Sequence, residues 1–159
     1  MARKLLNGCL ILLVAFICPL AVIVSAGGGS LVFASPIEPS EVEVDVRHPK
    51  GVPLNEPFLI HISVTNEADG IQTLNDIDLN AGALDVLEMV DASPPFLRTS
   101  RAPFFEVYWF EEEIRAGETL EVSLEMVARE TGTHPLRLGV CINVPESCMD
   151  FESTLVVTK

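Results

Sequence analysis

Alternating apolar and polar positions near the C-terminus predict three consecutive β-strands. Between Leu120 and Ala128, apolar side chains occupy nearly every second position and polar side chains most of the positions between them. The same period of two recurs over 136–142 and 149–157, and a turn sequence precedes each strand. This period places one face of a strand in a core and the other in water. The stretch 114–158 therefore predicts one half of a sandwich, against which the rest of the domain is built.

Five further runs with the character of strands precede this stretch. They lie at 42–46, 58–64, 74–79, 84–90 and 104–110. Segments rich in Gly, Pro, Asn and Asp separate most of these runs and predict turns. No sustained helical period is found over 41–159, so the pattern predicts an all-β sandwich of seven or eight short antiparallel strands.

The N-terminal segment has a different pattern. Arg3 and Lys4 precede 22 uncharged residues, Leu5 to Ala26. A run of about 20 apolar residues spans a bilayer as a helix. The basic residues before it predict that the N-terminus is cytoplasmic and that the chain after Ala26 is extracytoplasmic.

A cleaved signal peptide is the alternative interpretation of this segment. Val24-Ser25-Ala26 and Val32-Phe33-Ala34 both resemble cleavage sites with small residues. Both interpretations export the domain, which is secreted if the segment is cleaved and anchored to the cell membrane by a single span if it is not. The predicted organisation is a transmembrane anchor or signal peptide over 1–26, a flexible linker over 27–40 and the sandwich over 41–159.

Charge narrows the choice of partners. The chain carries a formal net charge of −13, and because Arg3 and Lys4 are the charged residues of the first 34, the remainder carries a net charge of −15. A surface this acidic argues against binding to nucleic acid and to anionic lipid headgroups. Solubility, a basic partner or bound cations remain as interpretations.

Cys141 and Cys148 predict a disulfide between the last two strands. Both fall on the polar side of their strands, and an exported domain lies in an oxidising compartment. If the two cysteines are directly opposite, Arg137 faces Glu152 on the same side of the hairpin. A redox pair or a metal pair is disfavoured because the spacing is not Cys-x-x-Cys and no second ligand pair is present. Cys9 and Cys18, in the N-terminal segment, are interpreted as small apolar residues.

The segment Asp76-Ile77-Asp78-Leu79-Asn80 invites a calcium interpretation. In an EF-hand loop counted from Asp76, the sixth position is Gly and the twelfth is Glu, but this chain has Ala81 and Leu87 there. We therefore interpret the segment as a solvated strand edge. A calcium site of another type, completed by Asp69 or Asp85, stays open, and no metal ligand is assigned.

Six of the ten aromatic residues lie between 96 and 110. The alternation of a strand cannot bury all of those at 104–110 on one face. We expect Phe105 and Trp109 in the core, and we assign Phe104, Tyr108 and Phe110 to a partner-binding surface, because exposed aromatic patches commonly mark such surfaces. A carbohydrate platform would use the same residues.

Three segments together resemble bacterial immunoglobulin-like cell-surface repeats of the adhesion-related type. They are 84–95 with its Ser93-Pro94-Pro95 ending, Trp109 before Ala116-Gly117-Glu118-Thr119, and Glu130-Thr131-Gly132-Thr133-His134 before an alternating strand. The resemblance covers about 41–159 and implies an immunoglobulin-like sandwich outside the membrane. It implies no shared catalytic residues. This chain has His134-Pro135 where relatives often have Tyr.

These observations predict a membrane-anchored extracytoplasmic interaction module, either an adhesion domain or an accessory subunit of a larger membrane complex, with a protein partner. The alternative is an exported domain that binds a small ligand, carbohydrate or calcium. The chain has no Gly-x-Ser-x-Gly or His-Glu-x-x-His motif, and its three histidines show no metal or triad spacing. We expect no enzymatic activity, no cofactor and no nucleic-acid partner.

Overall fold

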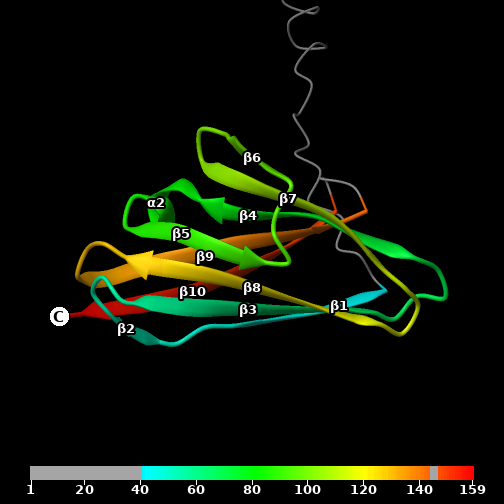
Figure 1. Cartoon of the computed structure of the whole chain (residues 1–159), viewed down its shortest axis with the longest axis horizontal. Helices are drawn as coiled ribbons and strands as arrows, with labels where there is room; N and C mark the ends of the chain where they lie inside the picture. The colour runs from blue at the N-terminus through cyan, green and yellow to red at the C-terminus, as the bar shows by residue number, and fades with distance from the viewer. Residues whose placement is uncertain (1–40, 144–146) are drawn as a thin grey trace, which may run out of the picture. The chain divides into compact units, whose positions relative to one another are not determined.

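The computed structural model describes residues 41–143 and 147–159, which form two β-sheets packed face to face (Figure 1). The predicted anchor (1–26) and linker (27–40) lie outside the described residues. Among the residues that are described, no helix has the length and apolar character needed to cross a membrane.

The strands of the four-stranded sheet, in spatial order, are β1 (Val42–Arg47), β3 (Pro57–Asn66), β8 (Thr119–Ala128) and β5 (Leu87–Ser93). Those of the six-stranded sheet are β2 (Gly51–Pro53), β10 (Cys148–Thr158), β9 (Gly132–Ile142), β4 (Gln72–Asn80), β7 (Phe105–Ile114) and β6 (Arg98–Arg101). One short helix, α2 (Ala81–Leu84), follows β4. All strand pairs are antiparallel except β2 with β10. The predicted all-β sandwich is confirmed.

Two strands and the helix differ from the sequence prediction. The segment before β3, predicted as a break, contains β2, which pairs with β10 over three residues. The strand β6 is fully exposed and polar, so it carries no alternation that would reveal it. The run predicted as a strand from Leu84 begins only at Leu87, because α2 occupies its start.

The core lies between the two sheets and is made by the inward positions of their strands. Ile60, Ile62 and Leu124 supply it from the four-stranded sheet, and Ile77 and Phe110 from the six-stranded one. All five side chains are almost completely buried. Burial of a side chain of this size stabilises the fold by about 1.5–3 kcal/mol.

The predicted register of the terminal hairpin is confirmed. Cys141 lies directly opposite Cys148, and Arg137 lies directly opposite Glu152, as expected if the disulfide joins opposite positions of the two strands. Arg137 and Glu152 form an ion pair. On the other side of the hairpin, Met149 faces Val140 and Phe151 faces Leu138.

A β-bulge in β4 sets which of its side chains face outward. Both ladders of β4 shift register between Leu74 and Asp76. Leu74 and Ile77 are therefore both buried in the core although they are three positions apart. The extra residue turns Asp76 away from the core, onto the same face as Asp78.

Candidate functional site

The outer face of the six-stranded sheet, the side turned away from the core, brings together side chains from four strands. Phe105 of β7 pairs with Asn80 of β4. Asp78 of β4 pairs with Gly139 of β9, and Gly139 pairs with Asp150 of β10. Residues far apart in the sequence thus form two neighbouring rows across the sheet, with aromatic character at the β7 end and acidic character at the β10 end.

The aromatic end of this face is solvent-exposed and well supported. Phe104, just before β7, is 79% exposed, and Phe105 is 39% exposed. Trp109 lies on the same face, and its indole ring is covered by the guanidinium of Arg98 at 4.3 Å from the ring centroid. The indole Nε1 donates a hydrogen bond of 3.3 Å to Ser100 Oγ. The hairpin of β6 and β7 therefore presents Phe104 beside an ordered surface.

The assignment of Tyr108 and Phe110 to a partner-binding surface is wrong. Both side chains point into the core, where they are 4% and 1% exposed, because their parity on β7 is the inward one. Tyr108 packs edge-on against Phe96, with ring centroids 5.3 Å apart, and burial raises the pKa of its hydroxyl to about 12, with a further contribution from Glu106. Phe104 is the member of the predicted set that is exposed.

The expectation for Phe105 and Trp109 is also wrong. These residues take the opposite parity of β7 and lie on the outer face rather than in the core. The sequence showed that the cluster had to divide between two faces, but the density of aromatic residues did not reveal which parity faced inward.

A hollow of about 300 Å³ lies beside Phe104 and Phe105. Its charged lining consists of Asp78, Arg137, Asp150 and Glu152. Since Arg137 is paired with Glu152, the carboxylates of Asp78 and Asp150 give the hollow a net negative character. We call it the acidic hollow.

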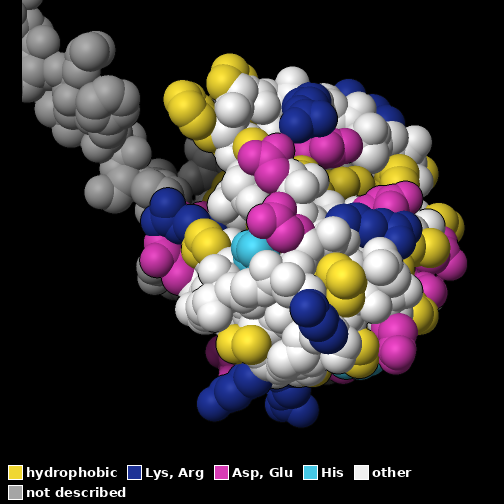
Figure 2. All heavy atoms as spheres, turned by 90° about the vertical axis from the view of Figure 1, so that its left-hand side faces the viewer, with side chains coloured by type: hydrophobic (Ala, Val, Ile, Leu, Met, Phe, Trp, Pro, Cys, Tyr) yellow, Lys and Arg dark blue, Asp and Glu magenta, His cyan; other side chains and the backbone are white. Residues whose placement is uncertain are grey.

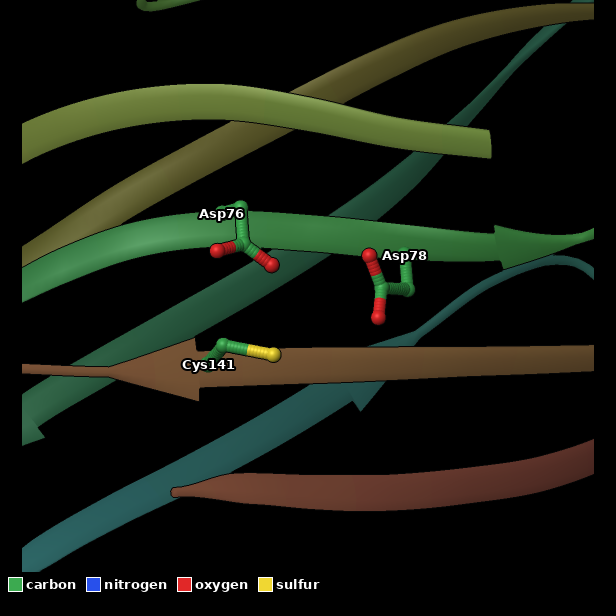
Figure 3. A group of neighbouring side chains, drawn as sticks. All are labelled: Asp76, Asp78 and Cys141. Atoms are coloured by element: carbon green, nitrogen blue, oxygen red, sulfur yellow. The ribbon is translucent and has the colours of Figure 1, made fainter. Parts of the chain in front are cut away.

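Asp76, which is buried, and Asp78, which is half-buried and lines the acidic hollow, form a carboxyl pair on β4. Figure 3 shows their side chains on the same side of β4, with Cys141 of the neighbouring strand β9 opposite them. One oxygen of each carboxyl and the Cys141 sulfur all lie within 4.8 Å of one another. Asp76 is only 2% exposed, and its Oδ2 has no hydrogen-bond partner among the described residues, nor does Asp78 Oδ1.

Burial and mutual repulsion shift the pKa of both carboxyls upward. Burial is the main reason that the pKa of Asp76 rises from 3.8 to about 7, and the charge of Asp78 adds to it, while Arg98 opposes it. Burial also raises the pKa of Asp78 to about 6, with a further contribution from Asp150. Carboxyl groups close together in a poorly solvated site resist full ionisation.

The interpretation of 76–80 as a solvated strand edge is therefore wrong. The strand β4 lies inside the six-stranded sheet, between β9 and β7, so Asp76 is flanked by the paired residues Cys141 and Trp109 rather than placed at an edge. Asp69 and Asp85, which the sequence offered as further calcium ligands, are exposed and are not part of the cluster. One feature of the sequence could have revealed the shift of this strand's parity. Leu74 and Ile77 are apolar and three positions apart, a spacing that a β-bulge produces within a strand.

The predicted disulfide between Cys141 and Cys148 is present and joins β9 to β10. Cys141 is almost completely buried, beside the carboxyl pair. Because its sulfur is bonded to Cys148, it offers no thiolate to a metal ion. The ligand atoms that the cluster offers are therefore carboxylate oxygens.

The histidines lie apart and have different partners. His48 Nε2 and Ser153 Oγ are 2.7 Å apart, and His61 Nδ1 and Ser123 Oγ are 3.2 Å apart. His134 Nε2 is 3.2 Å from the carbonyl oxygen of Glu130. Among the described residues, no carboxyl is hydrogen-bonded to either His–Ser pair, so neither has the arrangement of a catalytic triad.

The end of the sandwich that carries the C-terminus differs from the outer face. Figure 2 shows basic and acidic side chains interspersed there, with separate hydrophobic groups between them. Such a mixed surface is ordinary for a soluble domain. It offers no concentration of one chemistry comparable with the acidic hollow and its aromatic border.

No protein-family model matches the chain, and no curated protein sequence matches it. Solved structures do resemble its fold. The cupredoxin domain of amoB from Nitrosocaldus yellowstonii has a TM-score of 0.52 at 10% identity, covering 77% of this chain and 90% of that one. AvmM, which catalyzes macrocyclization in alchivemycin A biosynthesis, has a TM-score of 0.51 at 8% identity, covering 76% and 90%. The native α2-macroglobulin of Escherichia coli matches with a TM-score of 0.49 at 16% identity, over 76% of this chain and 7% of that one.

The two of these with TM-scores above 0.5 show the fold alone, a β-sandwich of the immunoglobulin-like type. The strand order agrees, because β1-β3-β8-β5 and β10-β9-β4 correspond to the ABED and GFC sheets of an immunoglobulin domain. The β6–β7 hairpin extends the second of these sheets beyond β4. Membership in the bacterial cell-surface repeat family is not shown and stays a prediction.

Proposed function

We propose that the chain is an extracytoplasmic interaction module that binds a protein partner through the outer face of its six-stranded sheet. It would act as an adhesion domain or as an accessory subunit of a membrane complex, and 1–26 would anchor it. The observation that carries this proposal is the exposure of Phe104, which stands at the border of the acidic hollow with 79% of its surface open to solvent. An exposed aromatic beside a concave, charged surface is typical of a binding site.

The chemistry of the face defines the partner. Asp78 and Asp150 leave the hollow negatively charged, and the exported part of the chain carries a net charge of −15. A partner segment with a Lys or Arg beside an apolar side chain would complement both the carboxylates and the phenyl ring of Phe104. Such complementarity favours specificity and fast association.

The disulfide supports the extracytoplasmic placement. Bonds of this kind persist in oxidising compartments and are rare in the cytosol of most organisms. The bridge between Cys141 and Cys148 is consistent with the orientation predicted from Arg3 and Lys4.

Site-specific photocrosslinking in native cells tests the proposal. The photoreactive residue p-benzoylphenylalanine replaces Phe104 in one version of the full chain and Leu59 in the control. Leu59 is an exposed apolar residue (42%) on the outer side of the four-stranded sheet, so it is matched in character but placed on the other face. We expect a discrete adduct with one protein from position 104 and none from position 59. Equal labelling from both positions, or none from position 104, would contradict the proposal.

A carbohydrate is the second candidate ligand, favoured by one feature of the hollow. Phe104 and Phe105 border a concave surface whose other lining residues include Asn80 and Asp78, which supply polar groups next to an apolar ring. A glycan array probed with the wild-type chain and with Phe104→Ala separates the two functions. Binding of one glycan class that is lost in Phe104→Ala would replace the protein partner by a carbohydrate.

A further inference from the structure

One oxygen of Asp76 and one of Asp78 are buried without a hydrogen-bond partner among the described residues. Asp76 is 2% exposed, and its Oδ2 has no hydrogen-bond donor among the described residues. Asp78 Oδ1 is also buried and also has no hydrogen-bond donor among these residues. Burying an ionised carboxylate without a counter-charge or a hydrogen bond is costly. These two oxygens therefore point to a ligand that fills the space between them.

A third carboxyl approaches the pair from β10. Gly139 lies between Asp78 and Asp150 and has no side chain to separate them. A Cβ atom placed on Gly139 would lie 3.4 Å from Asp150 Oδ1 and 3.8 Å from Asp78 Oδ2. Both carboxyls therefore border the space above the backbone of Gly139, and both line the acidic hollow.

Basic side chains near the cluster are engaged elsewhere. Arg98 stacks on Trp109 and is 3.6 Å from Glu111, and Arg137 is paired with Glu152. Within 41–143 and 147–159, none of the ion pairs includes Asp76, Asp78 or Asp150. Arg98 favours the ionised form of Asp76 without forming an ion pair with it, so no described ion pair neutralises the cluster.

We propose that Asp76, Asp78 and Asp150 form a binding site for a hard divalent cation, with calcium as its best candidate. The offered ligand atoms are carboxylate oxygens, which calcium prefers, and the hollow leaves room for water to complete the coordination. The disulfide excludes Cys141 as a thiolate, so the set does not favour a soft metal. This site shares Asp78 and Asp150 with the acidic hollow, whereas the protein-binding proposal is carried by Phe104.

Two features of the fold, a β-bulge and a glycine, bring the carboxyls of this site together. The bulge before Asp76 turns a carboxyl outward that would otherwise take the inward parity of Leu74. The glycine at 139 leaves the space in which the carboxyls of β4 and β10 converge. Each feature lies in a strand interior, where a bulge or a glycine usually has a packing or functional reason.

Calcium titration of the full chain in mild detergent, after removal of metal with a chelator, tests the site. We expect saturable binding of one ion per chain by calorimetry, with a dissociation constant of about 10⁻⁴–10⁻³ M, the range of extracellular calcium modules. The variants Asp76→Asn and Asp78→Asn should each weaken binding at least about tenfold, because each removes a charge and keeps the side-chain shape. The thermal midpoint of the wild type should rise with calcium, and that of either variant should not.

Asp85→Asn and Asp69→Asn are the matched controls, since they remove one exposed carboxylate each outside the cluster. Their calcium affinity should stay within about twofold of the wild type. The proposal is overturned if the wild type shows no saturable binding at millimolar calcium. It is also overturned if Asp76→Asn and Asp78→Asn bind as tightly as the controls, because the ion would then lie elsewhere. Calcium binding is measured on the purified chain and the photocrosslink from position 104 in cells, so either result can fail without the other and the two proposals are tested separately.

Discussion

Asp76 couples the folding of the metal-free chain to pH. Its pKa is about 7 in the folded state, mainly because of burial and of Asp78, whereas an unfolded aspartate has a pKa near 3.8. Folding therefore takes up a proton between these values. The contribution of Asp76 to stability is fully present below about pH 4 and is lost as the pH rises toward about 7.

The variant Asp76→Asn should remove this dependence. We expect its free energy of unfolding, relative to the wild type, to rise by a few kcal/mol from about pH 4 to about pH 8, because one pKa unit corresponds to about 1.4 kcal/mol. Asp78, Asp150 and Arg98 face the same cluster and remain in both proteins. Denaturant unfolding at the two pH values, with chelator present, measures the difference. Parallel pH profiles for the variant and the wild type would show that Asp76 ionises normally.

Single residues show where sequence analysis reaches its limit. Asn66 is polar and ends β3, yet it is completely buried, and its Nδ2 donates to the carbonyl oxygens of Gly70 and Ile114 at 2.7 and 2.8 Å. Gly70 lies between β3 and β4, and Ile114 is the last residue of β7. No local pattern reveals that an asparagine joins segments 48 residues apart, because the partner is set by the packing of the sheets.

At the scale of elements, the alternating strands were predictable and the irregular ones were not. The strands β3, β8 and β9 carry the period of two that one buried face imposes. The strand β6 has no buried position and, among the described strands, pairs with β7 alone. Its sequence therefore lacks the alternation of apolar and polar residues that predicts a strand. The bulge in β4 changed the parity of the strand and concealed the buried carboxyl pair.

The β9–β10 hairpin depends on its disulfide. In the chain-entropy model, a bridge that closes a loop this short stabilises the fold by about 2.5 kcal/mol. The double variant Cys141→Ser/Cys148→Ser should lose about this much free energy of unfolding. The double substitution also avoids leaving a single free thiol.

Guanidinium unfolding of the wild type, with and without reductant, measures the same contribution independently. The reductant should destabilise the wild type and leave the double variant unchanged. Equal stability of the reduced and oxidised wild type would contradict a structural role for the bridge. The exposed ion pair of Arg137 and Glu152 on the same hairpin should contribute less than about 1 kcal/mol.

At the scale of the whole molecule, the two sheets have different roles. The four-stranded sheet provides half of the core, while the six-stranded sheet gathers the exposed aromatic, the acidic hollow and the carboxyl cluster on one face. The β6–β7 hairpin widens this second sheet (Figure 1). Arg98 and Trp109 pair across its two strands, and Phe104 lies in the loop that joins them. The sequence predicted an aromatic binding surface, but its acidic half became visible only when β4, β9 and β10 were placed side by side.

The central claim is that the outer face of the six-stranded sheet binds the partner, and an affinity measurement tests it most directly. The protein captured at position 104 is purified, and its binding to the full chain is compared for the wild type, Phe104→Ser and Leu59→Ser. We predict that Phe104→Ser weakens binding at least about tenfold, as expected for an aromatic residue at the centre of an interface, and that Leu59→Ser changes it by less than about twofold. Unchanged affinity in Phe104→Ser, or an equal loss in both variants, would contradict the claim.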